Sequence, residues 1–305
     1  MKEKYDVVVV GGGAAGLSAA LTLARARRAV LVVDAGAPRN APAGQVHNYL
    51  ASEGMPPGNL LAAGRAEVTG YGGEVVTGTV TSAQPLDGKE AGEGFRVVLA
   101  DGRAVLARRL LVATGLVDEL PDVPGVAERW GREVLHCAYC HGWEVRDQAI
   151  GVLTSGPLAV HQALLFRQWS ADVTLFRHTG PAPSQAECEQ LAARGIAVVD
   201  GEVAALEVTD DRLTGVRLRS GELIPRQAVV VAPRFTARAD VLASLGLEPT
   251  EQQIDGHVVG SHVPADPTGA TAIPGVWVAG NVTDLRAQVI SAAAAGVNGR
   301  VMTAV

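Results

Sequence analysis

Lysine is nearly absent from this sequence. Only Lys2, Lys4 and Lys89 stand among its 26 basic residues, and 32 acidic residues give a formal net charge of −6. Binding to a polyanion needs clustered positive charge, so this composition argues against nucleic acid or an anionic membrane as the main partner.

Long apolar runs are also missing. The N-terminal run Val7–Val10 ends at glycines and is too short for the core of a signal peptide. No stretch of about 18 apolar residues is present that could span a membrane. We therefore expect a soluble, cytoplasmic protein with no membrane partner.

Cysteine is scarce, and Cys137, Cys140 and Cys188 cannot build a disulfide framework. Two of them form a Cys-x-x-Cys pair, which in a chain of 305 residues points to redox or metal chemistry. Cys188 lies in an ordinary amphipathic helical pattern and is interpreted as a structural or incidental thiol.

The first 35 residues predict a complete βαβ unit. Tyr5–Val10 and Val30–Val33 have the continuous apolar pattern of buried strands, Leu17–Arg28 has helical periodicity, and Asp34 closes the second strand. A length of 305 residues and a hydrophobic content of 48% fit one large α/β unit or two domains.

A second βαβ pattern appears further along the chain, and other elements surround it. After a proline-rich loop at Ala35–Gly58, the predicted elements are a helix at Leu60–Tyr71, antiparallel strands at Glu74–Thr81, Phe95–Ala100 and Ala104–Leu106, a buried strand at Leu110–Ala113, the βαβ unit Ala149–Leu153, Leu158–Trp169 and Asp172–Phe176, a helix at Ser184–Arg194, strands at Ile196–Asp200, Ala204–Thr209, Gly215–Arg219, Ala228–Ala232 and Gly275–Ala279, and a C-terminal helix.

Glycines follow the first strand in the pattern Gly11-x-Gly13-x-x-Gly16. The first glycine permits the tight turn, the second a close approach to a pyrophosphate, and the third close packing of helix on strand. The phosphates would lie at the N-terminus of the helix, and Asp34 could accept hydrogen bonds from ribose hydroxyls. The pattern predicts a dinucleotide site, although a turn that merely permits packing has the same glycines.

The pair Cys137-Ala-Tyr-Cys140 can close a disulfide, and the thiolate nearer the helix start would be the nucleophile for exchange. A metal site needs two further ligands, and no second cysteine pair or His-x-His group occurs. His136 and His141 flank the pair too closely to complete a site with it. We expect redox chemistry and no metal, with inert thiols as the remaining alternative.

Four motifs of this chain occur in the order seen in low-molecular-weight thioredoxin reductases: Gly11–Gly16, Ala113–Gly115, Cys137–Cys140 and Gly275–Asn281. The chain resembles that family over essentially its whole length. The resemblance implies an α/β fold of two Rossmann-like, three-layer nucleotide-binding domains, the second inserted in the first. Residues 1–117 and 244–305 would bind FAD, residues 118–243 would form an NAD(P)-binding-like insert that carries the dithiol, and the protein would be a homodimer. The FAD-binding residues that it implies are Gly11, Gly13, Ala14, Ala15, Gly16, Asp34, Ala35, Arg39, Gln45, Asn48, Val80, Ala113, Thr114, Gly115, Gly280, Asn281, Gln288 and Val289.

One departure from that family concerns the second nucleotide site. The reductase fingerprint Gly-x-Gly-x-x-Ala is replaced by residues 154–159, in which Thr154 opposes the tight turn and Pro157 lacks an N–H donor. Arg177 stands alone where reductases place a His-Arg-Arg cluster for the 2′-phosphate of NADPH. Use of NAD(P)H is therefore doubtful.

A second departure is His141, which follows Cys140 where reductases have an aspartate. A histidine there titrates near neutrality and could take protons from an incoming dithiol, or it could simply cap the helix or pack beside Trp143. The run Cys137–Glu144, together with Gly280–Asp284, resembles the thioredoxin-reductase-like dithiol oxidases. Those enzymes close disulfides in natural products of the holomycin and gliotoxin type and pass electrons through FAD to oxygen.

The resulting hypothesis is an FAD-dependent oxidase of a small-molecule dithiol. Substrate thiolate attacks Cys137 of the disulfide, His141 with help from His136 accepts protons, and Cys140 is, by resemblance, the sulfur nearest the flavin. The segment around Gln45–Met55 and the dithiol helix would line the substrate pocket. Two alternatives stay open: an NAD(P)H-dependent reductase of a thioredoxin-like protein, and a flavin-loaded redox sensor without turnover.

Overall fold

The computed structural model describes residues 1–86, 94–156, 158–254 and 256–298. The chain divides into two compact units. Unit 1 comprises Met1–Ala41, Met55–Val117 and the chain from Phe235 on, and unit 2 comprises Pro42–Gly54 and Asp118–Arg234. Each unit is built on a parallel sheet covered by helices, so the predicted fold of two Rossmann-like units is confirmed.

The centre of unit 1 is a parallel arrangement of strands in the order β3-β2-β1-β6-β19. Val7 and Val9 of β1 pack toward one face and Val8 and Val10 toward the other, which explains the absence of polar alternation in this strand. The strands are β1 (Lys4–Val10), β2 (Val30–Asp34), β3 (Glu74–Thr77), β6 (Ala104–Val112) and β19 (Val276–Val278).

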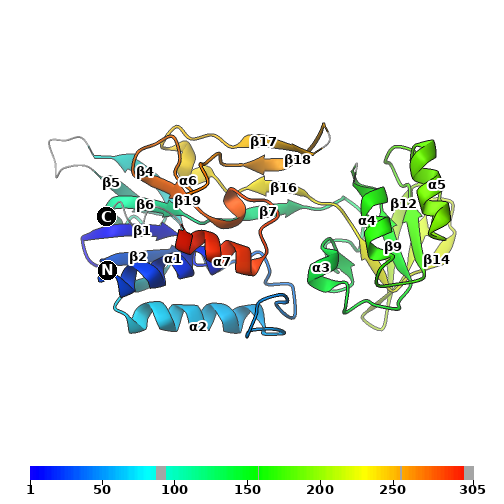
Figure 1. The fold of residues 1–305 in the computed structure, drawn as a ribbon, viewed down its shortest axis with the longest axis horizontal. Helices are drawn as coiled ribbons and strands as arrows, with labels where there is room; N and C mark the ends of the chain where they lie inside the picture. Colours follow the sequence, from blue (N-terminus) through cyan, green and yellow to red (C-terminus); the bar gives the residue numbers. More distant parts are fainter. Residues whose placement is uncertain (87–93, 157, 255, 299–305) are drawn as a thin grey trace. The chain divides into compact units, whose positions relative to one another are not determined.

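Helices α1 (Ala14–Arg25), α2 (Pro57–Gly70) and α7 (Val289–Asn298) lie on one side of this sheet (Figure 1). Small residues allow α7 to approach α1 closely, because a Cβ atom at Gly296 would clash with the carbonyl of Ala15. At Gly280, which has a φ of +76°, a Cβ atom would lie 3.0 Å from the Cβ of Ala15. The C-terminal part of the chain is thereby packed against the first βα turn.

Two strand predictions in unit 1 are wrong. Glu74–Thr81 is not one antiparallel strand: β3 pairs in parallel with β2, and the chain turns at Gly78 before β4 (Val80–Pro85) pairs antiparallel with β5 (Phe95–Leu99). The predicted strands Ala104–Leu106 and Leu110–Ala113 form the single strand β6. Arg108 interrupts the apolar pattern there, but its side chain is exposed and leaves the ladder unbroken.

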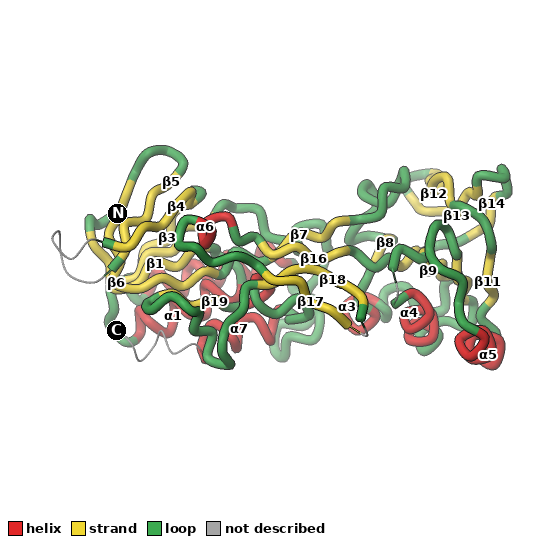
Figure 2. Tube along the Cα trace, turned by 90° about the horizontal axis from the view of Figure 1, so that it is seen from above, coloured by secondary structure: helices red, strands yellow, loops and turns green. Residues whose placement is uncertain are grey.

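A further sheet, in the order β17-β18-β16-β7, was not predicted (Figure 2). Its strands are short, and β17 reads Thr-Glu-Gln-Gln-Ile, which carries no strong strand pattern. The elements are β7 (Leu116–Glu119), β16 (Arg234–Ala237), β17 (Thr250–Ile254) and β18 (His257–His262), accompanied by the helix α6 (Asp240–Ala243) and the 3₁₀ turn η1 (Gly280–Val282).

Unit 2 contains the second βαβ unit that the sequence predicted, as β9-α4-β10 in the parallel sheet order β11-β10-β9-β15-β8. Helices α3, α4 and α5 pack on one face of this sheet and the antiparallel strands β12, β13 and β14 on the other (Figure 2). The elements are β8 (Val134–Leu135), α3 (Ala138–His141), β9 (Ile150–Leu153), α4 (Ala159–Phe166), β10 (Val173–Phe176), α5 (Gln185–Ala193), β11 (Ala197–Val199), β12 (Val203–Thr209), β13 (Arg212–Leu218), β14 (Leu223–Pro225) and β15 (Ala228–Val230).

The unit boundaries differ from the expected insert of residues 118–243. Residues 235–243 lie in unit 1, because β16 pairs with β18 and Leu242 is buried in the unit 1 core. Pro42–Gly54, expected with the FAD domain, packs in unit 2, where the Asn48 amide donates a 2.7 Å hydrogen bond to the carbonyl of Tyr139. Within the described ranges, no helix is long and apolar enough to cross a membrane.

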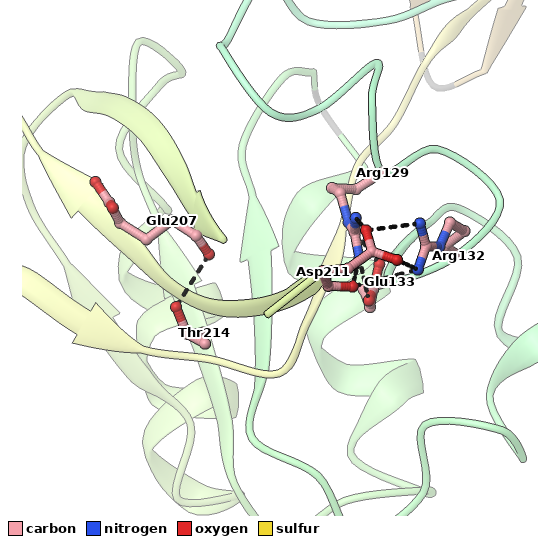
Figure 3. A network of polar contacts seen from close by, with 6 residues as sticks. All are labelled: Arg129, Arg132, Glu133, Glu207, Asp211 and Thr214. Atoms are coloured by element: carbon pink, nitrogen blue, oxygen red, sulfur yellow. Dashed lines mark hydrogen bonds and ion pairs between the residues drawn. The ribbon is translucent and has the colours of Figure 1, made fainter. Parts of the chain in front are cut away.

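A buried arginine organises one end of unit 2 (Figure 3). Arg129 is only 4% exposed, and its guanidinium makes a bidentate contact with Glu133 at 2.7 and 2.9 Å and a 2.6 Å contact with Asp211. Arg132 also bonds Asp211, and the two arginines hold the pKa of that carboxyl well below its usual range. The network fixes the segment before β8 to the turn between β12 and β13.

Replacing Arg129 with alanine is expected to lower the free energy of unfolding by about 2 kcal/mol, because the buried guanidinium and its hydrogen bonds to Glu133 and Asp211 are lost. The matched control is Arg132→Ala, which removes a half-exposed guanidinium from the same carboxylate and should have a much smaller effect. Urea unfolding followed by circular dichroism measures both losses. Equal losses in the two variants would contradict the role assigned to Arg129.

Candidate active site

The first βα turn of unit 1 has the geometry of an anion-binding turn. Gly11 has a φ of +106°, and a Cβ atom there would clash with the backbone of Ala113, while one at Gly16 would clash with the carbonyl of Gly11. Gly13 is different, because a Cβ atom there would meet nothing within 4 Å. Gly13 is also the N-cap of α1, and no side chain caps this helix. The turn therefore leaves open N–H groups and open space, which fits the pyrophosphate of a dinucleotide.

Asp34 lies at the end of β2 beside this turn. Its carboxylate accepts a 2.5 Å hydrogen bond from Arg65 and longer bonds from the N–H groups of Gly12 and Gly36. Burial by itself would raise the pKa of Asp34, but these donors outweigh it and hold the pKa below its usual value. The ionised carboxylate expected at this position is thus present. Arg65, on α2, was not predicted from the sequence, because nothing local links it to residue 34.

The remaining implied flavin residues of unit 1 come from several segments. Arg39 lies 3.4 Å from the Asn281 Oδ1 atom and 5.3 Å over the ring of Phe235, which the sequence did not single out. The Thr114 hydroxyl donates to the carbonyl of Arg238 at 2.6 Å. Ala14 and Ala15 form the start of α1, Ala35 follows β2, Ala113 and Gly115 flank Thr114 after β6, Gly280 precedes Asn281 in η1, and Gln288 and Val289 lie at the start of α7.

The other three implied flavin residues lie in β4 and in the segment Pro42–Gly54 of unit 2. Val80 is a buried core residue at the start of β4, where it pairs with Leu99. Gln45 and Asn48 are exposed and belong to unit 2. They stand in the same segment as His47, beside the dithiol helix.

Cys137 and Cys140 form a disulfide at the start of the short helix α3, with Cα atoms 5.2 Å apart. Cys137 is the N-cap of this helix, and its Sγ atom accepts a 3.1 Å hydrogen bond from the N–H of Cys140. A donor aimed at Sγ favours the thiolate that appears when the disulfide opens, so Cys137 is suited to the nucleophilic and leaving-group role. Cys188 is free and exposed on α5.

Two histidines and two glutamates gather beside the disulfide. His141 lies on α3, and its ring meets the ring of His47 edge-on, with centroids 6.2 Å apart. The Nδ1 atom of His47 lies 2.5 Å from Glu53 and its Nε2 atom 3.3 Å from Glu144, although the latter pair is not aligned for a hydrogen bond. The sequence placed the segment around Gln45–Met55 at the substrate pocket with the dithiol helix, but it singled out neither His47 nor Glu53 within that segment.

Burial lowers the pKa of His141 below its usual value, the charge of Glu144 acts in the opposite direction, and His47 adds to the lowering. The Nε2 atom of His141 is buried, and no hydrogen-bond partner occurs for it in the described part of the chain. His141 is thus a neutral imidazole at neutral pH with an open nitrogen, which suits a base. His136 instead stacks on Trp130 at a centroid distance of 5.4 Å.

The turn after β9, where a nicotinamide fingerprint would lie, has the buried Thr154 in place of its first glycine, while a Cβ atom at Gly156 would meet nothing within 4 Å. Thr154 is buried, and its methyl group fills the space at Gly180, where no Cβ atom could fit. The Ser155 hydroxyl lies 3.1 Å from both the carbonyl and the N–H of Ala232. Pro157, expected to remove a phosphate donor, lies outside the described residues.

The basic residues that follow β10 are already engaged. Arg177 makes a 2.6 Å ion pair with Asp200, and the Nδ1 atom of His178 accepts the N–H of Val203 at 3.0 Å. Burial lowers the pKa of His178, which keeps its ring neutral. Neither side chain is set to bind a phosphate in this arrangement. In the parts of the chain that the structure describes, no group of His, Cys, Asp or Glu could hold a metal ion.

Comparisons with known proteins agree with the doubled nucleotide fold and the dithiol. Residues 5–297 match the model of the pyridine nucleotide-disulphide oxidoreductases. The chain belongs to this family. It is therefore an oxidoreductase enzyme of the thioredoxin reductase-like group, as the sequence predicted.

Curated relatives span nearly the whole chain. Thioredoxin reductase aclD of Aspergillus oryzae is 30% identical over 292 residues, which cover 91% of this chain and 88% of the relative. Thioredoxin reductase sirT of Leptosphaeria maculans is 30% identical over 311 residues, which cover 96% and 91%. Among solved structures, HlmI is 48% identical with a TM-score of 0.89, covering 98% of this chain and 91% of that one. An oxidoreductase from Agrobacterium tumefaciens is 34% identical with a TM-score of 0.88, covering 97% and 95%.

Proposed function

We propose that this enzyme is an FAD-dependent dithiol oxidase that forms a disulfide in a small-molecule dithiol, with oxygen as the electron acceptor. The observation that carries the proposal is the contrast between two nucleotide turns. The first turn has glycine at all three positions of the fingerprint, whereas in the second turn the buried Thr154 stands in place of the first glycine, and Arg177 after the next strand is paired with Asp200. An enzyme that does not bind a nicotinamide nucleotide can neither take electrons from NAD(P)H nor pass them to NAD(P)+, so it needs another electron acceptor.

FAD, when bound, supplies the capacity to take an electron pair from a dithiol and pass it to oxygen. The residues of unit 1 that would hold it are those of the glycine turn, Asp34, and the Thr114–Gly115 and Gly280–Asn281 turns. Asp34 would accept from ribose, and the open N–H groups of α1 would bind phosphate.

The chain's own thiol chemistry takes place at Cys137. A substrate thiolate attacks Cys137 Sγ and breaks the Cys137–Cys140 bond, and Cys140 leaves as a thiolate. The second substrate thiol then attacks the mixed disulfide, releases Cys137, and closes the product disulfide. His141, neutral and with a free Nε2 atom, takes the proton of an attacking thiol.

The surface near the disulfide supports a small, partly apolar substrate. Tyr139 lies within the dithiol turn and Trp143 shortly after it, and their side chains are 63% and 65% exposed. Arg146 stacks 4.2 Å over the Trp143 ring and fixes its orientation. Such exposed aromatic faces suit contact with rings or apolar groups of a dithiol. The second candidate, reduction of a thioredoxin-like protein, is favoured by the names of the relatives and uses the same disulfide.

An anaerobic titration distinguishes the two functions. We expect NADPH and NADH to leave the flavin absorbance of the purified enzyme unchanged, because Thr154 replaces the first glycine of the second turn and Arg177 is paired with Asp200. Dithiothreitol should bleach the same band, and admission of oxygen should restore it. Rapid bleaching by either nicotinamide would contradict the oxidase and support a reductase. Bleaching by dithiols with negligible oxygen consumption would favour a sensor without turnover.

A further inference from the structure

We propose that His47, Glu53 and Glu144 form a proton relay between His141 and the solvent. The inference rests on the proposed dithiol oxidation and adds to it three residues that do not touch the disulfide. They act through His141 and are positioning and proton-carrying groups rather than catalytic residues.

The proposed relay runs through neighbouring rings and carboxylates inside unit 2, where the Nε2 atoms of His141 and His47 have no hydrogen-bond partner among the described residues. The His47 ring meets His141 edge-on and is only 13% exposed, so it lies behind the base rather than in the solvent. Its two nitrogens each face a carboxylate, with Glu144 at 3.3 Å and Glu53 at 2.5 Å. The Glu53 side chain is 63% exposed and the Glu144 side chain 36%, so the series ends in water.

The segment that carries His47 is held in place by two bonds to the rest of the cluster. The Asn48 side chain donates to the carbonyl of Tyr139 at 2.7 Å, and the N–H of Asn48 donates to Glu53 at 2.8 Å. Asn48 adopts a φ of +60°, a left-handed conformation that asparagine tolerates better than most residues. The local backbone thus directs His47 toward α3 and Glu53 back onto His47.

The chemistry of the exchange creates the need for such a relay. Oxidation of one substrate dithiol breaks two S–H bonds, forms one S–S bond, and moves one electron pair into the Cys137–Cys140 bond, which breaks. The first thiol proton goes to Nε2 of His141, and the base must lose it before the second thiol can be deprotonated. Glu144 and His47 carry that proton away and Glu53 releases it to water, so no further oxidant or reductant is needed.

Rapid-quench alkylation of the FAD-loaded enzyme with dithiothreitol tests the relay directly. Mass spectrometry counts alkylated cysteines, and the free thiol of Cys188 provides an internal standard. We expect His47→Gln and Glu144→Gln each to slow opening of the disulfide about tenfold or more. The ionisation of dithiothreitol changes all rates with pH in the same way. Dividing each variant's rate by the wild-type rate at the same pH therefore cancels this effect.

The pH dependence separates a relay from a merely structural role. The wild-type rate should rise with pH through the lowered pKa of His141, because the neutral ring is the base. His47→Gln removes a group that lowers this pKa, so the inflection should move to higher pH. Glu144→Gln removes a charge that raises it, so the inflection should move to lower pH. A small diffusible base such as imidazole should partly restore His47→Gln, and Glu144→Asp should retain most of the rate.

The control is Glu189→Gln on α5, which makes the same change of charge in the same unit and should alter neither rate nor profile. Wild-type rates with unshifted inflections in both His47→Gln and Glu144→Gln would overturn the relay and leave dithiol oxidation standing. A wild-type disulfide that dithiothreitol does not open would instead remove the proposed function itself. Glu144 is partly exposed, so its glutamine variant serves if His47→Gln does not fold.

Discussion

Replacing Cys140 with serine is expected to abolish turnover, by at least about a thousandfold, while the purified protein keeps its flavin. Without the second sulfur no disulfide can form, and the electron pair of the substrate has no acceptor on the protein. Both cysteines lie in unit 2, and the glycine turn lies in unit 1, so the substitution leaves the flavin residues unchanged. Oxygen uptake with dithiothreitol measures the loss, and the flavin absorbance measures what is retained.

The Cys140→Ser variant also tests which cysteine sulfur forms the mixed disulfide with the substrate. In Cys140→Ser, the free Cys137 thiol can attack a cyclic disulfide product and form a mixed disulfide, which raises the protein mass by the mass of that product. Cys188→Ser is the matched control, because this thiol is exposed on α5 and takes no part in the exchange. Full oxygen uptake by Cys140→Ser would show that electrons do not pass through the pair.

Replacing Gly13 with serine is expected to keep or slightly raise the stability of the apoprotein and to lower its affinity for flavin. Gly13 is the uncapped N-cap of α1 with open space around a Cβ atom, so a serine hydroxyl could accept a free N–H of the first helical turn. That bond should leave the apoprotein as stable as the wild type, or more stable by a few tenths of a kcal/mol. The same hydroxyl occupies the place of a phosphate oxygen, and flavin affinity should fall at least tenfold.

Two other glycines show whether this result reflects the cofactor or the fold. Gly70→Ala, also in open space and on α2, should keep both stability and flavin. Gly16→Ala should lose flavin only by unfolding the turn, because its Cβ atom clashes with the carbonyl of Gly11. Fluorescence titration of apoprotein with FAD, together with thermal unfolding, measures both properties. Wild-type flavin affinity in Gly13→Ser would mean that no phosphate lies at this turn.

The disulfide and the two βαβ units could be predicted because each is local in the chain. A strand, a glycine turn and a helix are encoded within about thirty residues. Cys137 and Cys140 are close in space whatever the rest of the fold does, as the 5.2 Å between their Cα atoms shows. The errors arose where pairing depends on distant partners: β3 follows β2 in parallel, and the polar strand β17 is held by β18.

The sequence by itself determined the family, the doubled nucleotide fold and the redox pair, because short-range spacing carries all three. Only the tertiary structure showed that residues 42–54 pack in unit 2 and that His47 and Glu53 of this segment lie beside His141. It also decided that Thr154 is buried against Gly180, that Asp200 engages Arg177, and that Arg65 bonds Asp34. The physical reason is common to these cases. Burial and charge pairing depend on side chains that are distant along the chain and meet only in the folded protein.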